Sequence, residues 1–355
     1  MSNCTDIRQF LRTTQFDLTL EPITVVFFAI IYSVCITLGI IGNLLVVISV
    51  CQHRALQSVR NIFIVSLSCS DIVVSCVSAS VTPITAFSKV WLFGANLCYL
   101  LPLIQGTSLC FSTLTLTAIS IDRFILIVFP TRKPIQKSQA VRMVVFNCSL
   151  ALALSMPMFV KQKLVSYGDF CGQFCTEDWG TDTHARSVYG TLVFFIQFVF
   201  PFIVIAFCYT GISFKLRNGI MLRDIKKGNM TEQRKAALQR RIRTNRMLMA
   251  MVGVFFCCWL PSVVFNFLRD YQWLPKFVAD QEYLFGIITH SISISSTVWN
   301  PCLYTLCNEQ FRSAFTVLLN SIRSSSTKKN QNCQTLLSTN YAEASTRREN
   351  NFSTV

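Results

Sequence analysis

Residues 96–124 read NLCYLLPLIQGTSLCFSTLTLTAISIDRF, and this stretch decides the fold. Cys98 opens the run and Asp122-Arg123 closes it, with 23 residues between Cys98 and Asp122 that carry no formal charge. A helix rises about 1.5 Å per residue, so the segment is roughly 38 Å long, somewhat more than the ~30 Å hydrocarbon core of a bilayer. The stretch therefore predicts a helix that crosses a membrane.

One face of this predicted helix is polar near both ends and in the middle. Alternating steps of four and three give the residues on that face: Gln105, Leu109, Ser112, Leu116, Ile119 and Arg123. An arginine or glutamine exposed to lipid is costly, which disfavours a lipid-facing helix with scattered polar residues. The face should point toward other helices or a water-filled cavity.

The composition indicates several such helices. The chain has 355 residues, of which 52% are hydrophobic and 14% charged, and its mean hydropathy is +0.47. Soluble domains carry about 25% charged residues. Long apolar runs occupy residues 23–50, 61–86, 96–127, 140–160, 188–214, 243–268 and 281–306. We therefore predict an all-α membrane protein, a seven-transmembrane helix bundle.

The distribution of basic residues predicts the orientation. Of the Lys and Arg residues, eight fall on the N-terminal side of the predicted membrane and 24 on the other. The richer side is usually cytoplasmic, so we expect a plasma-membrane protein with its N-terminus outside and its C-terminus in the cytoplasm. The basic run 215–246 is either topological charge or a docking surface for an acidic or amphipathic partner. Nucleic-acid binding is disfavoured, because the basic residues frame hydrophobic spans.

Three parts follow along the chain. Residues 1–22 form an outer segment whose Asn3 begins a glycosylation sequon, although a chance tripeptide is nearly as good an interpretation. Residues 23–320 hold the seven spans and a short amphipathic helix after the last one. Residues 321–355, rich in Ser, Thr and Asn, are predicted to be a disordered cytoplasmic tail.

Only four of the 16 cysteines should meet an oxidising compartment, because most of the others lie within spans. Cys98 stands at the outer tip of the third span and Cys175 lies in the outer loop after the fourth. A disulfide between these two is the preferred pairing. Cys171 either pairs with Cys4 or stays free.

Polar residues on the inward faces converge at the outer end, under a loop that carries Glu177 and Asp178. They are Thr82, Thr85, Gln105, Gln197, Asn266, Asp270 and His290. We predict an open polar pocket with an acidic rim, which favours a cationic ligand. An arginine side chain would form a bidentate, charge-assisted contact with Asp270.

The middle and the inner end carry different chemistry. Oxygen atoms suited to a small hard cation come from Asp71, Ser112, Ser296 and Asn300. Pro261 and Pro301 should bend the sixth and seventh spans and give the sixth a pivot. At the inner end we expect a polar switch, made by Arg123, Tyr209 and Tyr304.

Other classes of protein fit less well. The sequence has no metal-ligand cluster, no phosphate-binding glycine loop and no evident nucleophile with a base, so no enzyme is predicted. Residues 281–306 contain no Lys for a retinal Schiff base. A transporter would need internal pseudo-symmetry, which the two halves do not show.

The chain resembles a rhodopsin-like (class A) G-protein-coupled receptor over about residues 23–320. The matching marks are Gly42-Asn43, Leu67 to Asp71, Cys98, Asp122-Arg123, Pro201 with Tyr209, Cys258 to Pro261, and Asn300-Pro301 with Tyr304. Within that class it is similar to the neuropeptide Y receptors and invertebrate neuropeptide F receptors. The residues behind this similarity are Gln105, Cys175 to Trp179, Asn266 with Asp270, His290, Ser295-Ser296 with Trp299, and Asn308 to Arg312.

This resemblance implies a receptor for an amidated peptide ending in Arg-Phe or Arg-Tyr. Asp270 would pair with the peptide's arginine, and the remaining pocket residues would hold its terminal residue and amide: Thr82, Gln105, Gln197, Asn266 and His290. The alternative is a non-peptide ligand, such as a lipid or an amine. Asp270 would then be only a solvated charge at the rim of the pocket.

The resemblance also implies how the signal passes. Phe255 and Trp259 would relay ligand binding, and Asp122-Arg123 would meet a heterotrimeric G protein, commonly of the inhibitory class. Asp71 and Ser112 would hold an allosteric sodium ion in the inactive state, and no other cofactor is expected. Membrane lipids and arrestin, the latter through the Ser/Thr-rich tail, are the further partners implied.

Three positions depart from the family pattern. Phe124 replaces the usual tyrosine after Asp122-Arg123, and Cys148 lies near the place of the usual fourth-span tryptophan. Arg241 stands where many receptors carry an acid that faces the arginine. Without that acid, the ion pair with Arg123 that would stabilise the inactive state is missing, and we expect activation to be easier.

Overall fold

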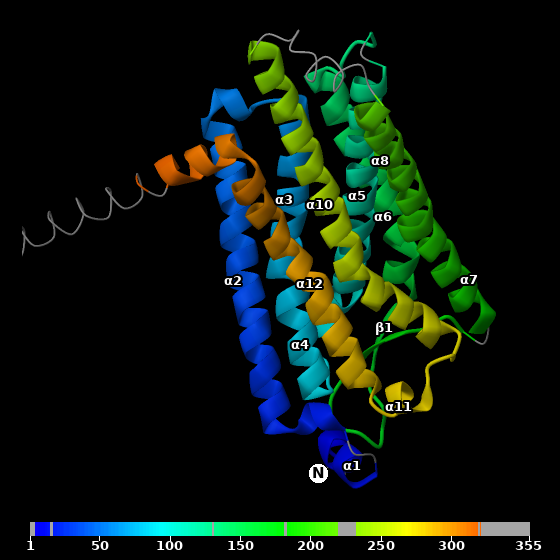
Figure 1. The fold of residues 1–355 in the computed structure, drawn as a ribbon. Coiled ribbons are helices and arrows are strands. Elements are labelled where there is room, and N and C mark those ends of the chain that lie inside the picture. Colours follow the sequence, from blue (N-terminus) through cyan, green and yellow to red (C-terminus); the bar gives the residue numbers. More distant parts are fainter. Residues whose placement is uncertain are drawn as a thin grey trace, which may run out of the picture.

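The computed structural model describes residues 4–14, 17–129, 131–180, 183–218, 232–318 and 320. Long helices run side by side in one bundle (Figure 1). In chain order they are α2 (Pro22–Gln52), α3 (Val59–Cys76) continued by α4 (Ser78–Ser88), α5 (Gly94–Val128), α6 (Lys137–Lys161), α7 (Thr183–Phe194) continued by α8 (Phe200–Asn218), α10 (Glu232–Asp270) and α12 (Glu282–Cys307).

Shorter elements cover the two ends of the bundle. The end that holds the N-terminus, here called the N-terminal end, carries α1 (Ile7–Thr14), η1 (Leu18–Leu20), the antiparallel pair β1 (Gln162–Val165) and β2 (Phe174–Glu177), and α11 (Lys276–Ala279) (Figure 1). At the opposite end, η2 (Arg54–Leu56) precedes α3, and a helix over residues 309–318 turns sideways from the bundle. Phe311 and Phe315 of that helix are buried, as its amphipathic pattern predicts.

Within the described residues, six helical segments are long and apolar enough to cross a membrane. They match the first six predicted spans, while α12 is the more polar seventh. Its hydroxyl-bearing residues Ser291, Ser293, Ser296 and Thr297 are buried, and α12 packs against α2 and α10. Because neighbouring helices shield these groups from lipid, α12 needs less apolar sequence than the others.

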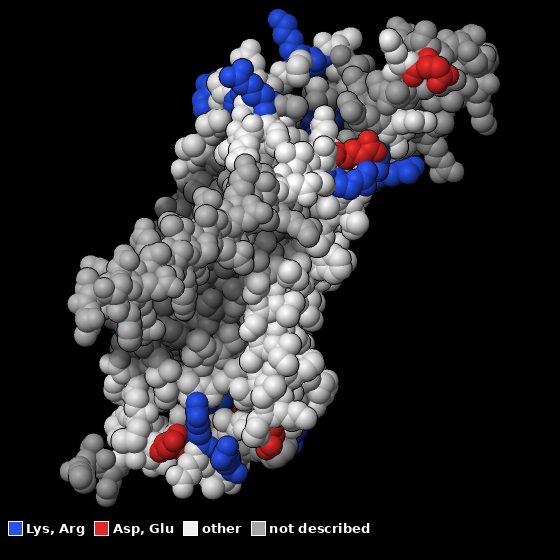
Figure 2. All heavy atoms as spheres, turned by 90° about the vertical axis from the view of Figure 1, so that its left-hand side faces the viewer, with Lys and Arg blue, Asp and Glu red and all other residues white. Residues whose placement is uncertain are grey.

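Charged side chains at the surface of one face lie near the two ends of the molecule (Figure 2). On the face shown in Figure 2, Lys, Arg, Asp and Glu of the described residues lie near both ends, and the surface between them carries no charge colour. Large apolar side chains such as Ile30, Leu38 and Phe207 are exposed along the helices. This distribution fits a bundle whose middle faces hydrocarbon.

Two spans depart from regular helix near the N-terminal end. The second span breaks between α3 and α4 at Val77, and the hydroxyl of Ser80 donates to the carbonyl of Ser75 at 3.3 Å. The fifth span contains a π-helical turn, η3, at Phe195–Val199. Such turns often mark functional sites, and this one buries Gln197 inside the bundle.

Glycines permit the close approach of α2, α3 and α12. A Cβ on Gly42 would lie 2.8 Å from Cγ of Pro301, and one on Gly39 would lie 2.8 Å from the hydroxyls of Ser75 and Thr297. Asn43 donates from Nδ2 to the carbonyl of Thr297 at 2.9 Å. The Gly42-Asn43 pair thus combines close packing with an interhelical hydrogen bond.

Two disulfides tie down the N-terminal end. Cys98 at the start of α5 is bonded to Cys175 in β2 with an S–S distance of 2.03 Å, which confirms the preferred pairing. Cys171 is bonded to Cys4, so the alternative of a free Cys171 is wrong. Beside this second bond, the backbone N–H of Thr5 donates to the carbonyl of Asp169 at 2.9 Å, which fixes the N-terminal segment to the loop.

A buried ion pair fixes the start of the first span. The Lys89 ammonium lies 2.6 Å from Oδ2 of Asp17 and 3.5 Å from the centre of the Tyr283 ring. Burial raises the pKa of Asp17, but hydrogen bonds from Lys89 and Thr19 outweigh this and hold it below its ordinary value of 3.8. The stability that Asp17 supplies is therefore complete at neutral pH, and it is lost as the pH falls below 3.8 toward the lower folded pKa.

Replacing Asp17 with Asn should leave the Lys89 charge buried without a countercharge. We expect the melting temperature of the purified protein in detergent to fall by about 2–6 °C, and a second change, Lys89→Met, to restore most of it. Asp178→Asn, which breaks an exposed pair with Lys163, is the matched control and should cost about 1 °C or less. Equal losses in Asp17→Asn and Asp178→Asn would contradict a special role for the buried pair.

Candidate ligand-binding site

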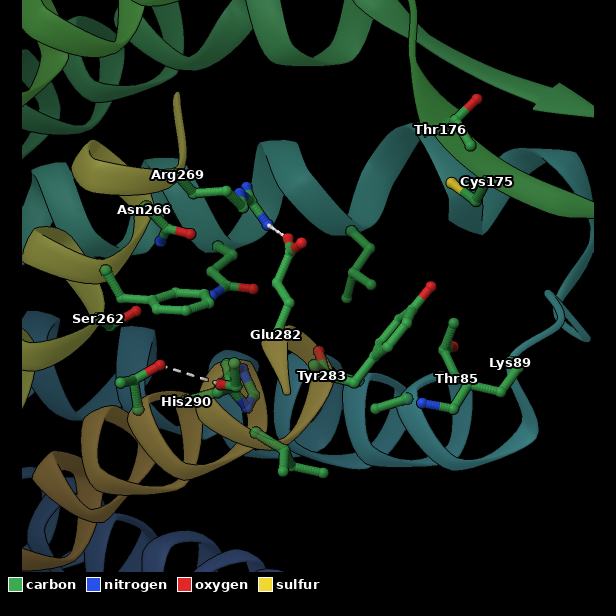
Figure 3. Close-up of a pocket in the computed structure, with 18 of the residues that line it drawn as sticks. Thr85, Lys89, Cys175, Thr176, Ser262, Asn266, Arg269, Glu282, Tyr283 and His290 are labelled. Carbon is green, nitrogen blue, oxygen red and sulfur yellow. Dashed lines mark hydrogen bonds and ion pairs between the residues drawn. The ribbon is translucent and has the colours of Figure 1, made fainter. Parts of the chain in front are cut away.

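A hollow with two lobes opens at the N-terminal end of the bundle. The first lobe, of about 430 Å³, lies between α4, α5, α10 and α12 (Figure 3), and the second, of about 410 Å³, extends toward α6 and α7. Residues from α4, α5 and α10 line both lobes: Thr82, Leu101, Gln105, Asn266 and Arg269. The two lobes therefore form one site with a common wall.

Most of the residues that the sequence assigned to the pocket lie around this hollow. Those lining the first lobe are Thr82, Thr85, Gln105, Asn266 and His290, and those lining the second are Thr82, Gln105, Glu177, Gln197, Asn266 and Asp270. Asp178 is the exception, since it lines neither lobe and pairs with Lys163 at 2.6 Å. Neighbouring residues of an extended strand point to opposite faces, so Glu177 turns inward and Asp178 outward.

A chain of hydrogen bonds links four helices beneath the first lobe. The Tyr32 hydroxyl lies 2.7 Å from Nδ1 of His290, and Nε2 of His290 lies 3.3 Å from the Ser78 hydroxyl. Ser78 donates to Oε1 of Gln105 at 2.9 Å. Because the Ser78 proton goes to Gln105, Nε2 of His290 donates to Ser78, and a histidine with its single proton on Nε2 accepts from Tyr32 at Nδ1. The histidine in this arrangement is neutral, and the Gln105 amide is oriented with its oxygen engaged.

The rim carries basic residues that the sequence pattern did not single out. Arg186 on α7 approaches Glu177 at 3.0 Å and Asp270 at 2.9 Å. Arg269 extends toward Glu282, with 3.9 Å between Nη1 and Oε1, and Lys89 lies beside Tyr283 (Figure 3). The predicted acidic rim is therefore interleaved with cations. Sequence order could not reveal this, because each pair joins segments from different parts of the chain.

In the middle of the bundle, two of the four predicted cation-binding residues meet, and the two relay aromatics pack together. Oδ2 of Asp71 accepts from Nδ2 of Asn300 at 2.8 Å, which joins α3 to α12. The Phe255 and Trp259 rings lie 6.1 Å apart on the buried face of α10. Two residues after Trp259, Pro261 lacks the N–H that a regular helix would donate to the carbonyl of Cys257, and the hydroxyl of Ser293 reaches the next carbonyl, that of Cys258, at 3.4 Å.

The opposite end holds the Asp122-Arg123 pair and two buried tyrosines, Tyr209 and Tyr304. Arg123 Nη2 lies 2.5 Å from Oδ2 of Asp122. Phe124 packs so closely on α8 that a Cβ on Gly211 would lie 2.6 Å from its ring. An aromatic ring thus fills this place without the tyrosine hydroxyl of the usual pattern.

Two other departures have different outcomes. Cys148 is exposed on α6. The side chain of Arg241 lies outside the described residues, as do Asn3 and the predicted tail 321–355. Two residues further along α10, Arg243 forms an ion pair with Glu309, which joins α10 to the helix over residues 309–318.

Comparison with known proteins agrees with the fold and the site. The family described as seven-transmembrane receptors of the rhodopsin family matches residues 42–304. The Caenorhabditis elegans neuropeptide receptor npr-1 is 33% identical, over 80% of this chain and 70% of its own length. The Drosophila melanogaster neuropeptide F receptor is 32% identical, over 81% of this chain and 61% of its own length. The crystal structure of squid rhodopsin superposes with a TM-score of 0.73 at 22% identity, covering 91% of each chain.

The chain therefore belongs to the rhodopsin family of seven-transmembrane receptors, the class A G-protein-coupled receptors. The predicted fold is confirmed, including the short helix after the seventh span. The chain is a multi-pass membrane receptor and not an enzyme. Its similarity to neuropeptide Y and neuropeptide F receptors is also confirmed.

Proposed function

We propose that this receptor binds an amidated neuropeptide ending in Arg-Phe or Arg-Tyr and passes the signal to a heterotrimeric G protein of the inhibitory class. The observation that carries the proposal is the Asp270 carboxylate, whose side chain is 13% exposed at the wall of the second lobe. A guanidinium and a carboxylate form paired, charge-assisted hydrogen bonds, which are about twice as strong as neutral ones. The names of the relatives, which are neuropeptide receptors, support the same ligand class.

The lining beneath the rim suits an amide better than a carboxylate. Gln105, Gln197 and Asn266 supply neutral donors and acceptors, and His290 is neutral in its hydrogen-bond chain. A free C-terminal carboxylate among these amides would lose its hydration, and Arg269, the cation that lines both lobes, already faces Glu282 at 3.9 Å. A carboxamide keeps both its donors and its acceptor satisfied, so Thr82 and these four residues would hold the terminal residue and its amide.

The topology proposed places this hollow outside the cell. Both disulfides lie at the N-terminal end, and disulfides persist in oxidising compartments. The excess of Lys and Arg lies on the other side, which favours the cytoplasm for the C-terminus. We propose a plasma-membrane receptor with the N-terminus and the ligand site facing outward.

Transmission would work by a shift between two populations of the receptor. A ligand changes their balance only by binding one of them more tightly. The sixth span would move about Pro261, with Phe255 and Trp259 as the relay, and would open the surface around Arg123, Tyr209, Asn300-Pro301 and Tyr304 to the G protein. Arrestin and membrane lipids would be further partners.

We also propose a sodium ion near Asp71. Asn300 is the only hydrogen-bond partner of Asp71 within the described part of the chain, and the other two residues predicted for this site, Ser112 and Ser296, are buried. A carboxylate with hydroxyl and amide oxygens fits a small hard cation. When bound, sodium supplies the positive charge that this buried acid needs.

Replacing Asp71 with Asn should remove the dependence of agonist affinity on sodium. In the unchanged receptor, replacing choline in the buffer with sodium, at constant ionic strength, should weaken agonist binding about three- to tenfold. Radioligand competition in the two salts gives the measurement. A sodium effect of the same size in Asp71→Asn would refute the site.

The function itself is tested by presenting amidated peptides that end in Arg-Phe or Arg-Tyr to cells expressing the receptor. We expect inhibition of cyclic AMP production that is blocked by pertussis toxin, and a loss of potency of about tenfold or more in Asp270→Ala. Lys163→Gln, at the same end but outside the hollow, is the control. Activation by amines or lipids alone, with Asp270→Ala behaving like the unchanged receptor, would refute the proposal.

The close packing of the Asp270 carboxylate against α7 allows a second test. A Cβ on Gly190 of α7 would lie 2.7 Å from Oδ2 of Asp270, so Gly190→Ala must displace the carboxylate. Alanine favours helix, so the change should not unfold α7. We expect a loss of peptide potency of about three- to tenfold at normal surface expression.

Gly253→Ala in α10 is the matched control, because its added Cβ would meet nothing within 4 Å and Gly253 lines neither lobe. Potency should therefore stay within about twofold. If Gly190→Ala and Gly253→Ala are equally harmless, the exact position of the Asp270 carboxylate does not matter for the peptide.

A further inference from the structure

One guanidinium already lies between the two acids of the second lobe. Arg186 places Nη2 at 2.9 Å from Oδ1 of Asp270 and Nε at 3.0 Å from Oε2 of Glu177. The two acids come from different elements, since Glu177 ends β2 and Asp270 ends α10. Arg186 therefore forms an ion pair with Asp270 where a cationic ligand would bind, although Oδ1 of Asp270 accepts no hydrogen bond within the described residues.

Hydrogen bonds from residues close to Arg186 on α7 hold this contact in place. The hydroxyl of Ser187 donates to the carbonyl of Asp270 at 3.0 Å, and the hydroxyls of Thr191 and Tyr271 lie 2.6 Å apart. Gly190 leaves room for the Asp270 carboxylate against α7. The ends of α7 and α10 are thus fixed to each other, and the Arg186 contact is part of a built site.

We infer that Arg186 is an internal counterion that occupies Asp270 until a cationic ligand side chain displaces it, and that it thereby sets the receptor's affinity for such ligands. This inference rests on the proposed function. It adds a specificity-determining residue that lies outside the polar face on which the ligand site was predicted.

The charges explain why displacement is feasible. The side chains of Arg186, Glu177 and Asp270 are 32%, 21% and 13% exposed, so the arginine is the member nearest to solvent. Glu177 also accepts from Nε1 of Trp179 at 3.1 Å. When a ligand guanidinium takes Asp270, Arg186 keeps its contact with Glu177 and needs only to turn away from α10.

Displacement also has a cost. Binding exchanges one arginine–carboxylate pair for another, so the ligand gains less than it would from a carboxylate without a partner. The neighbouring Arg269, whose Nε lies 4.0 Å from Oδ1 of Asp270, adds to the positive potential that an incoming cation meets. Removing the Arg186 charge should therefore strengthen the binding of cationic ligands and leave neutral ones nearly unaffected.

The test compares two peptides on one set of receptors. The first ends in Arg-Phe-amide, and the second carries citrulline, the uncharged analogue of arginine, in place of the arginine. In Arg186→Gln we expect the arginine peptide to bind about three- to tenfold more tightly, and the citrulline peptide to change by less than about twofold. Arg186→Lys should stay close to the unchanged receptor, and Lys163→Gln, which removes a charge outside the hollow, should have no effect.

The outcomes separate the two claims. If the unchanged receptor binds the arginine peptide and Arg186→Gln weakens both peptides equally, Arg186 supports the shape of the site and the counterion role is wrong. If the arginine peptide alone becomes weaker, Arg186 assists the ligand and the inference is overturned as well. An unchanged receptor that binds neither peptide would instead overturn the proposed function.

Discussion

A polar group inside a bilayer must meet another polar group, and the whole structure depends on this constraint. Asp71 meets Asn300, Asn43 meets the carbonyl of Thr297, and His290 meets Tyr32. Each contact joins α12 to α2 or α3. These contacts turn the polar faces of the helices inward, and they let α12 cross the membrane although it is the least apolar span. Toward the N-terminal end the helices spread, and the polar faces there line a hollow instead of meeting one another.

The segments between the spans determine what covers the opening of that hollow and which charges surround it. The disulfide from Cys98 to Cys175 brings β2 over the opening, and the bond from Cys4 to Cys171 fastens the N-terminal segment beside it. Acids and bases then alternate around the rim, as the contacts of Arg186 show. A ligand therefore meets both acids and bases at the rim and neutral amides below it. The rim selects ligands that can exchange ion pairs with it, and the amides select ligands that can form hydrogen bonds.

Much of this could be predicted from the sequence, since span length and helical periodicity are local properties. The seven spans, the disulfide between Cys98 and Cys175 and the inward polar faces required no knowledge of tertiary structure. The rim was harder to predict. Glu177 and Asp178 are adjacent in sequence, yet Glu177 at the end of β2 lines the second lobe and Asp178, the next residue, pairs with Lys163 outside it. The partners of Lys89 and Arg186 come from distant segments, so no periodicity in the sequence marks them.

The central claim is that Asp270 receives the arginine of a peptide ligand, and a double-mutant cycle tests it most directly. Binding is measured for the unchanged receptor and Asp270→Ala, each with a peptide that ends in Arg-Phe-amide and with its Ala-Phe-amide counterpart. If the two groups touch, either change alone should weaken binding about tenfold or more, and the second change should add less than about twofold. If the two changes together weaken binding by the product of their separate effects, the two groups act independently, and this would contradict the account.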